Sequence, residues 1–133
     1  MIATATNTVV VTIPVGNIPI GVAVTPDGAF AYVANQNSNS VSVIETASNT
    51  VVATVPGAGL PIGVAITPDG AFAYVTNFDS GTVSVIETVG NTVVTTVTVG
   101  PTPVDVAITP LPSDDEAPVT TNTTAVPNPV AVG

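Results

Sequence analysis

A repeat of 42 residues is the feature that most restricts the fold of this chain. The segment VTPDGAFAYVAN at 24–35 returns almost unchanged as ITPDGAFAYVTN at 66–77, and a third copy starts as VAITP at 106–110. A second block, IATATNTVVVTIP at 2–14, also recurs twice in the same phase. Self-similarity with a period of about 20 to 50 residues is the signature of repeat architectures. The chain is therefore expected to stack copies of one supersecondary unit.

Each repeat is predicted to form four short antiparallel strands. In the first repeat GVAVT ends at a Pro-Asp-Gly turn, AFAYVAN follows the turn, and VSVIET and VVATVP form a second hairpin. Val, Ile, Thr, Phe and Tyr fill these segments, whereas Gly, Pro, Asn and Asp lie mostly between them, which is typical of strands joined by turns. Most of these strands carry apolar or small residues on both faces, so both sides of each sheet are expected to be covered.

Four antiparallel strands in a repeat of about 40 residues describe one blade of a β-propeller. The predicted fold class is all-β, with two full four-stranded blades at about 20–56 and 62–99 and a shared or incomplete third blade. A β-solenoid is the alternative, but its coils are usually shorter and lack hairpin turns. Phe30 and Phe72 each lie in the middle of a strand, so both are expected to be buried between adjacent blades.

Two tetrapeptides, YVTN at 74–77 and YVAN at 32–35, carry a family resemblance together with the TPDG turns and the VIET hairpins. Over about residues 1–110 the chain resembles the YVTN-type β-propeller repeats of surface-layer and extracellular proteins. The resemblance implies blade structure and a surface setting, and it implies no particular activity. The chain departs from the family's pattern because it has too few blades to close a ring and no basic residues.

The strands predicted at the two ends of the repeats do not complete a blade. The chain opens with a stub of a third strand near Ile2 and a fourth strand at about 8–15, and the repeats end with a lone first strand at about 104–109. Such complementary ends predict head-to-tail association with other copies, which gives a ring if the rotation closes and a filament if it does not. The residues expected to carry this association are Thr8, Val9, Val10, Val11, Ile13, Val104, Val106 and Ile108.

Residues 111–133 form a Pro- and Thr-rich tail, for which two interpretations stay open. The tail is either a linker or a donor of short strands that add to an open sheet edge. Asp114, Asp115 and Glu116 are candidate calcium ligands, and a solvated acidic loop is the alternative. Asn122 starts an N-glycosylation sequon and is the glycosylation candidate.

The charge inventory restricts both partners and chemistry. The chain has nine acidic residues and no Lys, Arg or His, which gives a formal net charge of −9. Nothing in it can clamp phosphates, so no nucleic acid partner is expected, and no apolar run is long enough to predict membrane insertion. The absence of His and Cys argues against soft-metal sites, and no cofactor is predicted.

Carboxylates recur at equivalent positions in the two full repeats. Glu45 and Glu87 form one such pair, and Asp27 and Asp69 form another within the Pro-Asp-Gly turns. Equivalent positions lie one repeat apart in space, so these residues are expected to build turns rather than a catalytic acid–base pair. No catalytic residue is predicted, and the chain is not expected to be an enzyme.

These features together predict a non-enzymatic structural protein, a self-associating blade-repeat subunit of an extracellular or cell-surface filament or ring. A chain without Lys, Arg, Cys or Trp offers no site to trypsin-like proteases and little to oxidants, which suits a durable protein outside the cell. One alternative is a ligand- or protein-binding module of an oligomeric propeller. The other is a fragment of a larger propeller enzyme or surface-layer protein.

Overall fold

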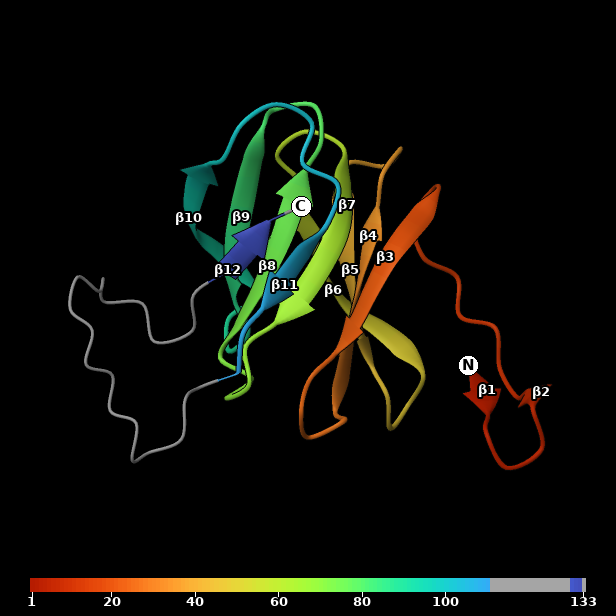
Figure 1. Cartoon of the computed structure of the whole chain (residues 1–133). Coiled ribbons are helices and arrows are strands. Elements are labelled where there is room, and N and C mark those ends of the chain that lie inside the picture. Colours follow the sequence, from red (N-terminus) through yellow and green to blue (C-terminus); the bar gives the residue numbers. More distant parts are fainter. Residues whose placement is uncertain (111–129, 133) are drawn as a thin grey trace, which may run out of the picture.

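The computed structural model describes residues 1–110 together with the backbone of 130–132. Two four-stranded antiparallel sheets dominate it (Figure 1), which confirms the predicted all-β fold of propeller blades. Blade 1 consists, in order, of β3 (Pro19–Val24), β4 (Phe30–Asn35), β5 (Ser40–Glu45) and β6 (Thr50–Pro56). Blade 2 repeats this order with β7 (Pro61–Ile66), β8 (Phe72–Asn77), β9 (Thr82–Glu87) and β10 (Thr92–Thr98).

Two smaller sheets of two strands each accompany the blades. The N-terminal half-blade pairs β1 (Ile2–Ala3) with β2 (Thr8–Val9), and the C-terminal half-blade pairs β11 (Val106–Ile108) with β12 (Val130–Val132). In Figure 1 the N-terminal half-blade lies apart from blade 1, and β11 lies on the other side of the molecule against β7 and β8 of blade 2. No described segment forms a helix with the length and hydropathy needed to span a membrane.

The terminal strands are shorter than the repeat predicts. The expected strand over 8–15 is only two residues long in β2. Beyond it, the Val10 N–H donates to the Met1 carbonyl at 3.0 Å and the Met1 amino group donates to the Val11 carbonyl at 2.7 Å, and no described strand lies beside residues 12–15. The expected strand at 104–109 is likewise reduced to β11, and Val104 lies outside it. A strand needs a partner as well as a sequence pattern, and among the described residues these two terminal strands are paired over only part of their expected length.

The hydrophobic core lies between blade 1 and blade 2. Side chains alternate between the two faces of a strand, so one face of blade 1 and one face of blade 2 meet across the interface. The buried members of this core are Tyr32, Val41, Val43 and Val55 from blade 1 and Ala73, Val75 and Ile86 from blade 2. The apolar residues on facing sheets therefore exclude water from the interface, as the two-faced apolar pattern predicts.

The prediction that Phe30 and Phe72 are buried is wrong, because both side chains remain partly exposed. Phe30 packs at the margin of the core rather than inside it. Phe72 lies on the face of blade 2 that points away from blade 1, because its neighbour Ala73 lies in the interblade core. Tyr32 lies two residues after Phe30 on the same face of β4. It is the aromatic residue that the interface buries, with 1% of its surface exposed.

The first strands of successive blades approach so closely that glycine is required between them. A Cβ atom at Gly21 would overlap the carbonyl oxygen of Ile62, and one at Gly63 would lie 2.9 Å from the carbonyl oxygen of Val104. The third repeat has Asp105 at this position. A further first strand therefore cannot pass Asp105 as closely as β7 passes Gly21.

Candidate functional site

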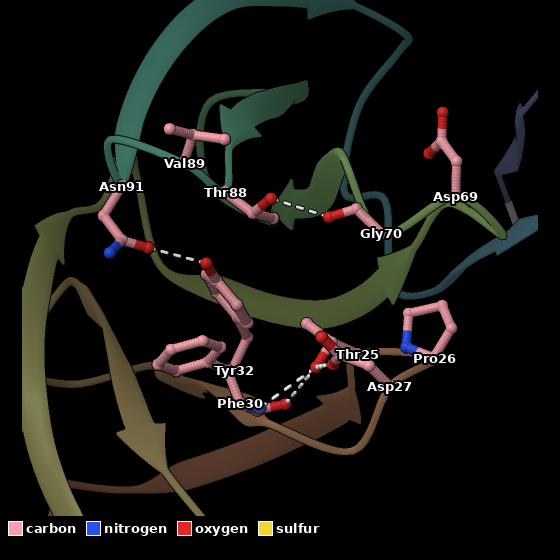
Figure 2. A pocket seen from close by; sticks show the side chains of 10 residues that line it. All are labelled: Thr25, Pro26, Asp27, Phe30, Tyr32, Asp69, Gly70, Thr88, Val89 and Asn91. Carbon is pink, nitrogen blue, oxygen red and sulfur yellow. Dashed lines mark hydrogen bonds between the residues drawn. The ribbon is translucent and has the colours of Figure 1, made fainter.

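A groove of about 400 Å³ opens between blade 1 and blade 2, at the end of the blades where the Pro-Asp-Gly turns lie (Figure 2). One wall comes from blade 1, and the other comes from the β7–β8 and β9–β10 turns of blade 2. The lining residues are Thr25, Pro26, Asp27, Phe30 and Tyr32 from blade 1 and Asp69, Gly70, Thr88, Val89 and Asn91 from blade 2.

The Pro-Asp-Gly turns at this end are closed by their own side chains. The Thr25 hydroxyl donates a hydrogen bond to Asp27 Oδ1 at 2.6 Å, and the same oxygen accepts the backbone N–H of Ala29 at 2.9 Å. Gly28 has a φ of 75°, a left-handed conformation that glycine adopts without strain. Blade 2 repeats the arrangement with Thr67 and Asp69, whose hydrogen bond is also 2.6 Å long.

These hydrogen bonds lower the pKa of both aspartates. The Thr25 hydroxyl, followed by the Ala29 N–H, holds the pKa of Asp27 below its ordinary value of 3.8. The pKa of Asp69 is lowered in the same way, first by Thr67 and then by the backbone of the turn. Both carboxylates are thus ionised acceptors at neutral pH and have no proton to donate, which fits the turn-building role predicted for them.

One hydrogen bond in the groove joins the two blades directly. The hydroxyl of Tyr32 donates to Asn91 Oδ1 at 2.6 Å, from β4 of blade 1 to the β9–β10 turn of blade 2 (Figure 2). Asn91 has a φ of 54°, a left-handed conformation that Asn tolerates better than most residues. Burial raises the pKa of Tyr32, so its hydroxyl remains a donor at any physiological pH.

The sequence interpretation missed this interblade hydrogen bond. Asn recurs at the same turn position in every repeat, as Asn7, Asn49 and Asn91, and Tyr recurs as Tyr32 and Tyr74. Both residue types recur with the same 42-residue period, and this shared period was the sequence signal that could have pointed to the contact. A turn Asn with a left-handed backbone and a mid-strand Tyr each have an ordinary local explanation, which conceals their contact.

The groove offers little for acid–base or nucleophilic chemistry. Its carboxylates accept hydrogen bonds within their turns, the Tyr32 hydroxyl is bound to Asn91, and the Thr88 hydroxyl donates to the Gly70 carbonyl at 2.6 Å. Across the described residues, no three His, Cys, Asp or Glu side chains gather in a way that could hold a metal ion. The calcium candidates Asp114, Asp115 and Glu116 and the glycosylation candidate Asn122 lie outside the described residues.

The two outward faces of the blade pair form a second candidate site. On the outer face of blade 2, which carries Tyr74, Thr95 and Val97, Val97 is 46% exposed, although its equivalent Val55 in the interblade core is only 1% exposed. On the outward side of blade 1, Asn49 Oδ1 is buried without a hydrogen-bond partner among the described residues. Each outward face thus carries a residue whose repeat equivalent is buried or hydrogen-bonded in the interface between the two blades.

The residues predicted to carry association are distributed between the two half-blades. The structure does not bring the two sets together, and Figure 1 places them on different sides of the blade pair. Thr8, Val9, Val10 and Val104 are exposed, Val11, Ile13 and Ile108 are partly buried, and Val106 is buried.

The family model described as "Lactonase, 7-bladed beta-propeller" matches residues 9–108. The chain belongs to this family. Its match begins in β2, includes both blades and ends in β11, so the blades themselves carry the family's pattern. No curated protein matches this lactonase-family chain.

Solved structures share the fold of this lactonase-family chain. Hydrazine synthase of Kuenenia stuttgartiensis is 30% identical with a TM-score of 0.69 over 74% of this chain. A functionally unknown protein from Desulfotomaculum acetoxidans is 22% identical with a TM-score of 0.71 over 81% of this chain. The dihydro-heme d1 dehydrogenase NirN is 21% identical with a TM-score of 0.67 over 82% of this chain. The match covers only 28%, 37% and 25% of those three chains, respectively.

Proposed function

We propose that this chain is a non-enzymatic structural segment of a larger β-propeller, and that its two half-blades are the places where the propeller is completed. The observation that carries the proposal is the pair of half-blades on either side of two full blades. Closed propellers have about four to eight blades, so the outer faces of blade 1 and blade 2 need further blades to cover them.

A structural rather than catalytic role is supported by the groove. Its ionisable groups are held in turns or in the Tyr32–Asn91 hydrogen bond. Two of the similar structures are enzymes by name, but the shared portion is about a quarter of each, and it consists of blades. We propose that this chain provides the blade scaffold of its family without providing catalytic residues of its own.

The added blades come, in this proposal, from self-association into a head-to-tail ring or filament. The resemblance to YVTN-type repeats and a composition free of Lys, Arg and Cys support an extracellular or cell-surface setting. The lack of cationic side chains also argues against a nucleic acid partner. The alternative source is a longer polypeptide that contributes the remaining blades, and the size of the family's seven-bladed propeller supports it.

Self-association is tested with an aspartate at an exposed apolar position of the N-terminal half-blade. Ile2 is 60% exposed, so Ile2→Asp is expected to leave the blades folded and to abolish association in light scattering. Val89→Asp adds the same charge at an exposed turn position and is expected to associate as the wild type does. Equal association of the Ile2→Asp and Val89→Asp variants would contradict the proposal.

A further inference from the structure

We infer that a second copy of this chain completes the C-terminal half-blade with its own N-terminal half-blade, and that Tyr74 then donates its hydroxyl hydrogen bond to Asn7 of the second copy. The inference rests on the proposed function and names the partner and the contact. The completed blade would take its first two strands, β11 and β12, from one copy and its last two, β1 and β2, from the other.

The N-terminal half-blade already has the register of the last two strands of a blade. In β1 and β2, the residues that pair across the two strands stand at the same repeat positions as the pairs between β5 and β6 and between β9 and β10. The equivalent opposed pairs are Ile2–Val9, Ile44–Val51 and Ile86–Val93. Asn7, in the turn of this hairpin, has a φ of 54°, the same value as Asn91 in blade 2.

The C-terminal half-blade has the register of the first two strands. The equivalent opposed pairs are Val22–Val33 in blade 1, Val64–Val75 in blade 2 and Val106–Val132 in the half-blade. The two half-blades are therefore complementary parts of one four-stranded sheet. In a complete blade Ala31 faces Ile44 between the second and third strands, so Val130 is expected to face Ile2 of the second copy.

The exposed side chains of the N-terminal half-blade fit the outer face of blade 2. Ile86, the equivalent of Ile2, is 1% exposed and packs in the core on the blade 1 face that carries Tyr32. Ile2 is 60% exposed, because no described blade packs against the hairpin that carries it. Placed in the completed blade, Ile2 of the second copy would contact the outer face of blade 2 in the way that Ile86 contacts blade 1. Burial of an isoleucine side chain is a favourable contribution to such an interface.

The hydrogen bond between Tyr32 and Asn91 identifies the matching polar contact. In that bond the Tyr of one blade donates to the turn Asn of the following blade at 2.6 Å. Tyr74 is the equivalent donor on blade 2 and is only partly buried. The blade that follows blade 2 is the shared one, and its turn Asn is Asn7 of the second copy. Each Tyr of the repeat would then have an Asn acceptor one blade further on.

The chain's own N-terminal half-blade cannot make this contact, because the two half-blades lie on different sides of the blade pair (Figure 1). The joint also differs from the internal interface at one point. Asp105 occupies the position of Gly21 and Gly63, so β3 of the second copy has to pass the shared blade at a wider spacing. The joint between copies is therefore expected to be weaker than the interface within a copy.

Disulfide cross-linking tests the expected pairing of β12 with β1 of the second copy. The chain has no cysteine of its own, so only the introduced cysteines can form a disulfide. An Ile2→Cys protein mixed with a Val130→Cys protein is expected to form a disulfide-linked dimer under mild oxidation. Thr8→Cys is the matched control, because β2 is separated from β12 by β1 in the completed blade; its yield with Val130→Cys is expected to be at least about tenfold lower. Equal yields, or no cross-link in either mixture, would overturn the inference.

Association measurements separate this inference from the proposed function. Tyr74→Phe is expected to raise the dissociation constant between copies about 3- to 10-fold through the loss of one hydrogen bond. Wild-type association without the cross-link between positions 2 and 130, or without an effect of Tyr74→Phe, would overturn the inference and leave self-association intact. A wild-type chain that stays monomeric would overturn self-association itself.

Discussion

Tyr32 and Tyr74 occupy the same position in consecutive blades, and the structure gives them different surroundings. Tyr32 is 1% exposed and bonded to Asn91, whereas Tyr74 remains partly exposed on the outer face of blade 2. The valines of the last strands differ in the same way, with Val55 at 1% exposure and Val97 at 46%. The local sequence is nearly identical, so the neighbouring blade makes the difference.

The comparison shows that blade faces in this chain depend on their neighbours for burial. The four strands of a blade pair with one another, but the aromatic and aliphatic side chains of a blade are covered only where another blade packs against them. The same holds for polar groups, because Asn91 Oδ1 has its Tyr donor and the equivalent Asn49 Oδ1 is buried without one in the described part of the chain. The outer faces thus carry the same residue types as the interface between the blades, but no described blade covers them.

Truncation of the two tyrosines gives the largest contrast between the faces. Tyr32→Ala is expected to lower the free energy of unfolding by about 3 to 5 kcal/mol, because it removes a buried aromatic ring and leaves a cavity between the blades. Tyr74→Ala is expected to cost about 1 kcal/mol or less in dilute solution, where its face is open. Urea denaturation followed by circular dichroism measures both, and equal losses would contradict the difference in burial.

Removal of the hydroxyl alone isolates the hydrogen bond. Tyr32→Phe is expected to lower the free energy of unfolding by about 1 to 3 kcal/mol, because Asn91 Oδ1 is left without its donor at a partly buried site. Tyr74→Phe is expected to change the stability of the dilute monomer by less than about 0.5 kcal/mol. Thermal unfolding of the two variants tests the contrast, and a stable Tyr32→Phe protein would show that the interblade bond contributes little.

The smallest expected effect concerns the turns that line the groove. The pKa of Asp27 and that of Asp69 lie below the ordinary 3.8, so each ionised carboxylate stabilises the fold above about pH 4, and this contribution is lost as pH falls through the lowered pKa. Thr25→Val removes the largest cause at Asp27 and is expected to raise its pKa toward 3.8 while leaving that of Asp69 unchanged. NMR titration of the carboxyl carbons checks this, and an unmoved pKa of Asp27 would assign the shift to another cause.

The sequence predicts the blades well because their determinants are local. The period of the repeat, the Pro-Asp-Gly turns and the alternation of apolar residues place the strands of blades 1 and 2 to within about two residues at each end. Contacts between blades are less accessible to sequence reasoning. Alternation shows which face carries Phe30, Tyr32 and Phe72, but not how far the neighbouring blade extends over that face. This is why Phe30 and Phe72 were expected to be buried and the Tyr32–Asn91 bond was missed.

The reactivity of the two tyrosines, which are the only ones in the chain, tests the central claim most directly. Nitration with tetranitromethane, quantified by mass spectrometry, is expected to modify Tyr74 and spare Tyr32 in dilute solution. As protein concentration rises and copies associate, Tyr74 is expected to become protected to the same degree as Tyr32. A reactivity of Tyr74 that does not change with protein concentration would contradict the account. So would a Tyr32 that reacts as readily as Tyr74 in dilute solution, because Tyr32 would then not be covered by blade 2.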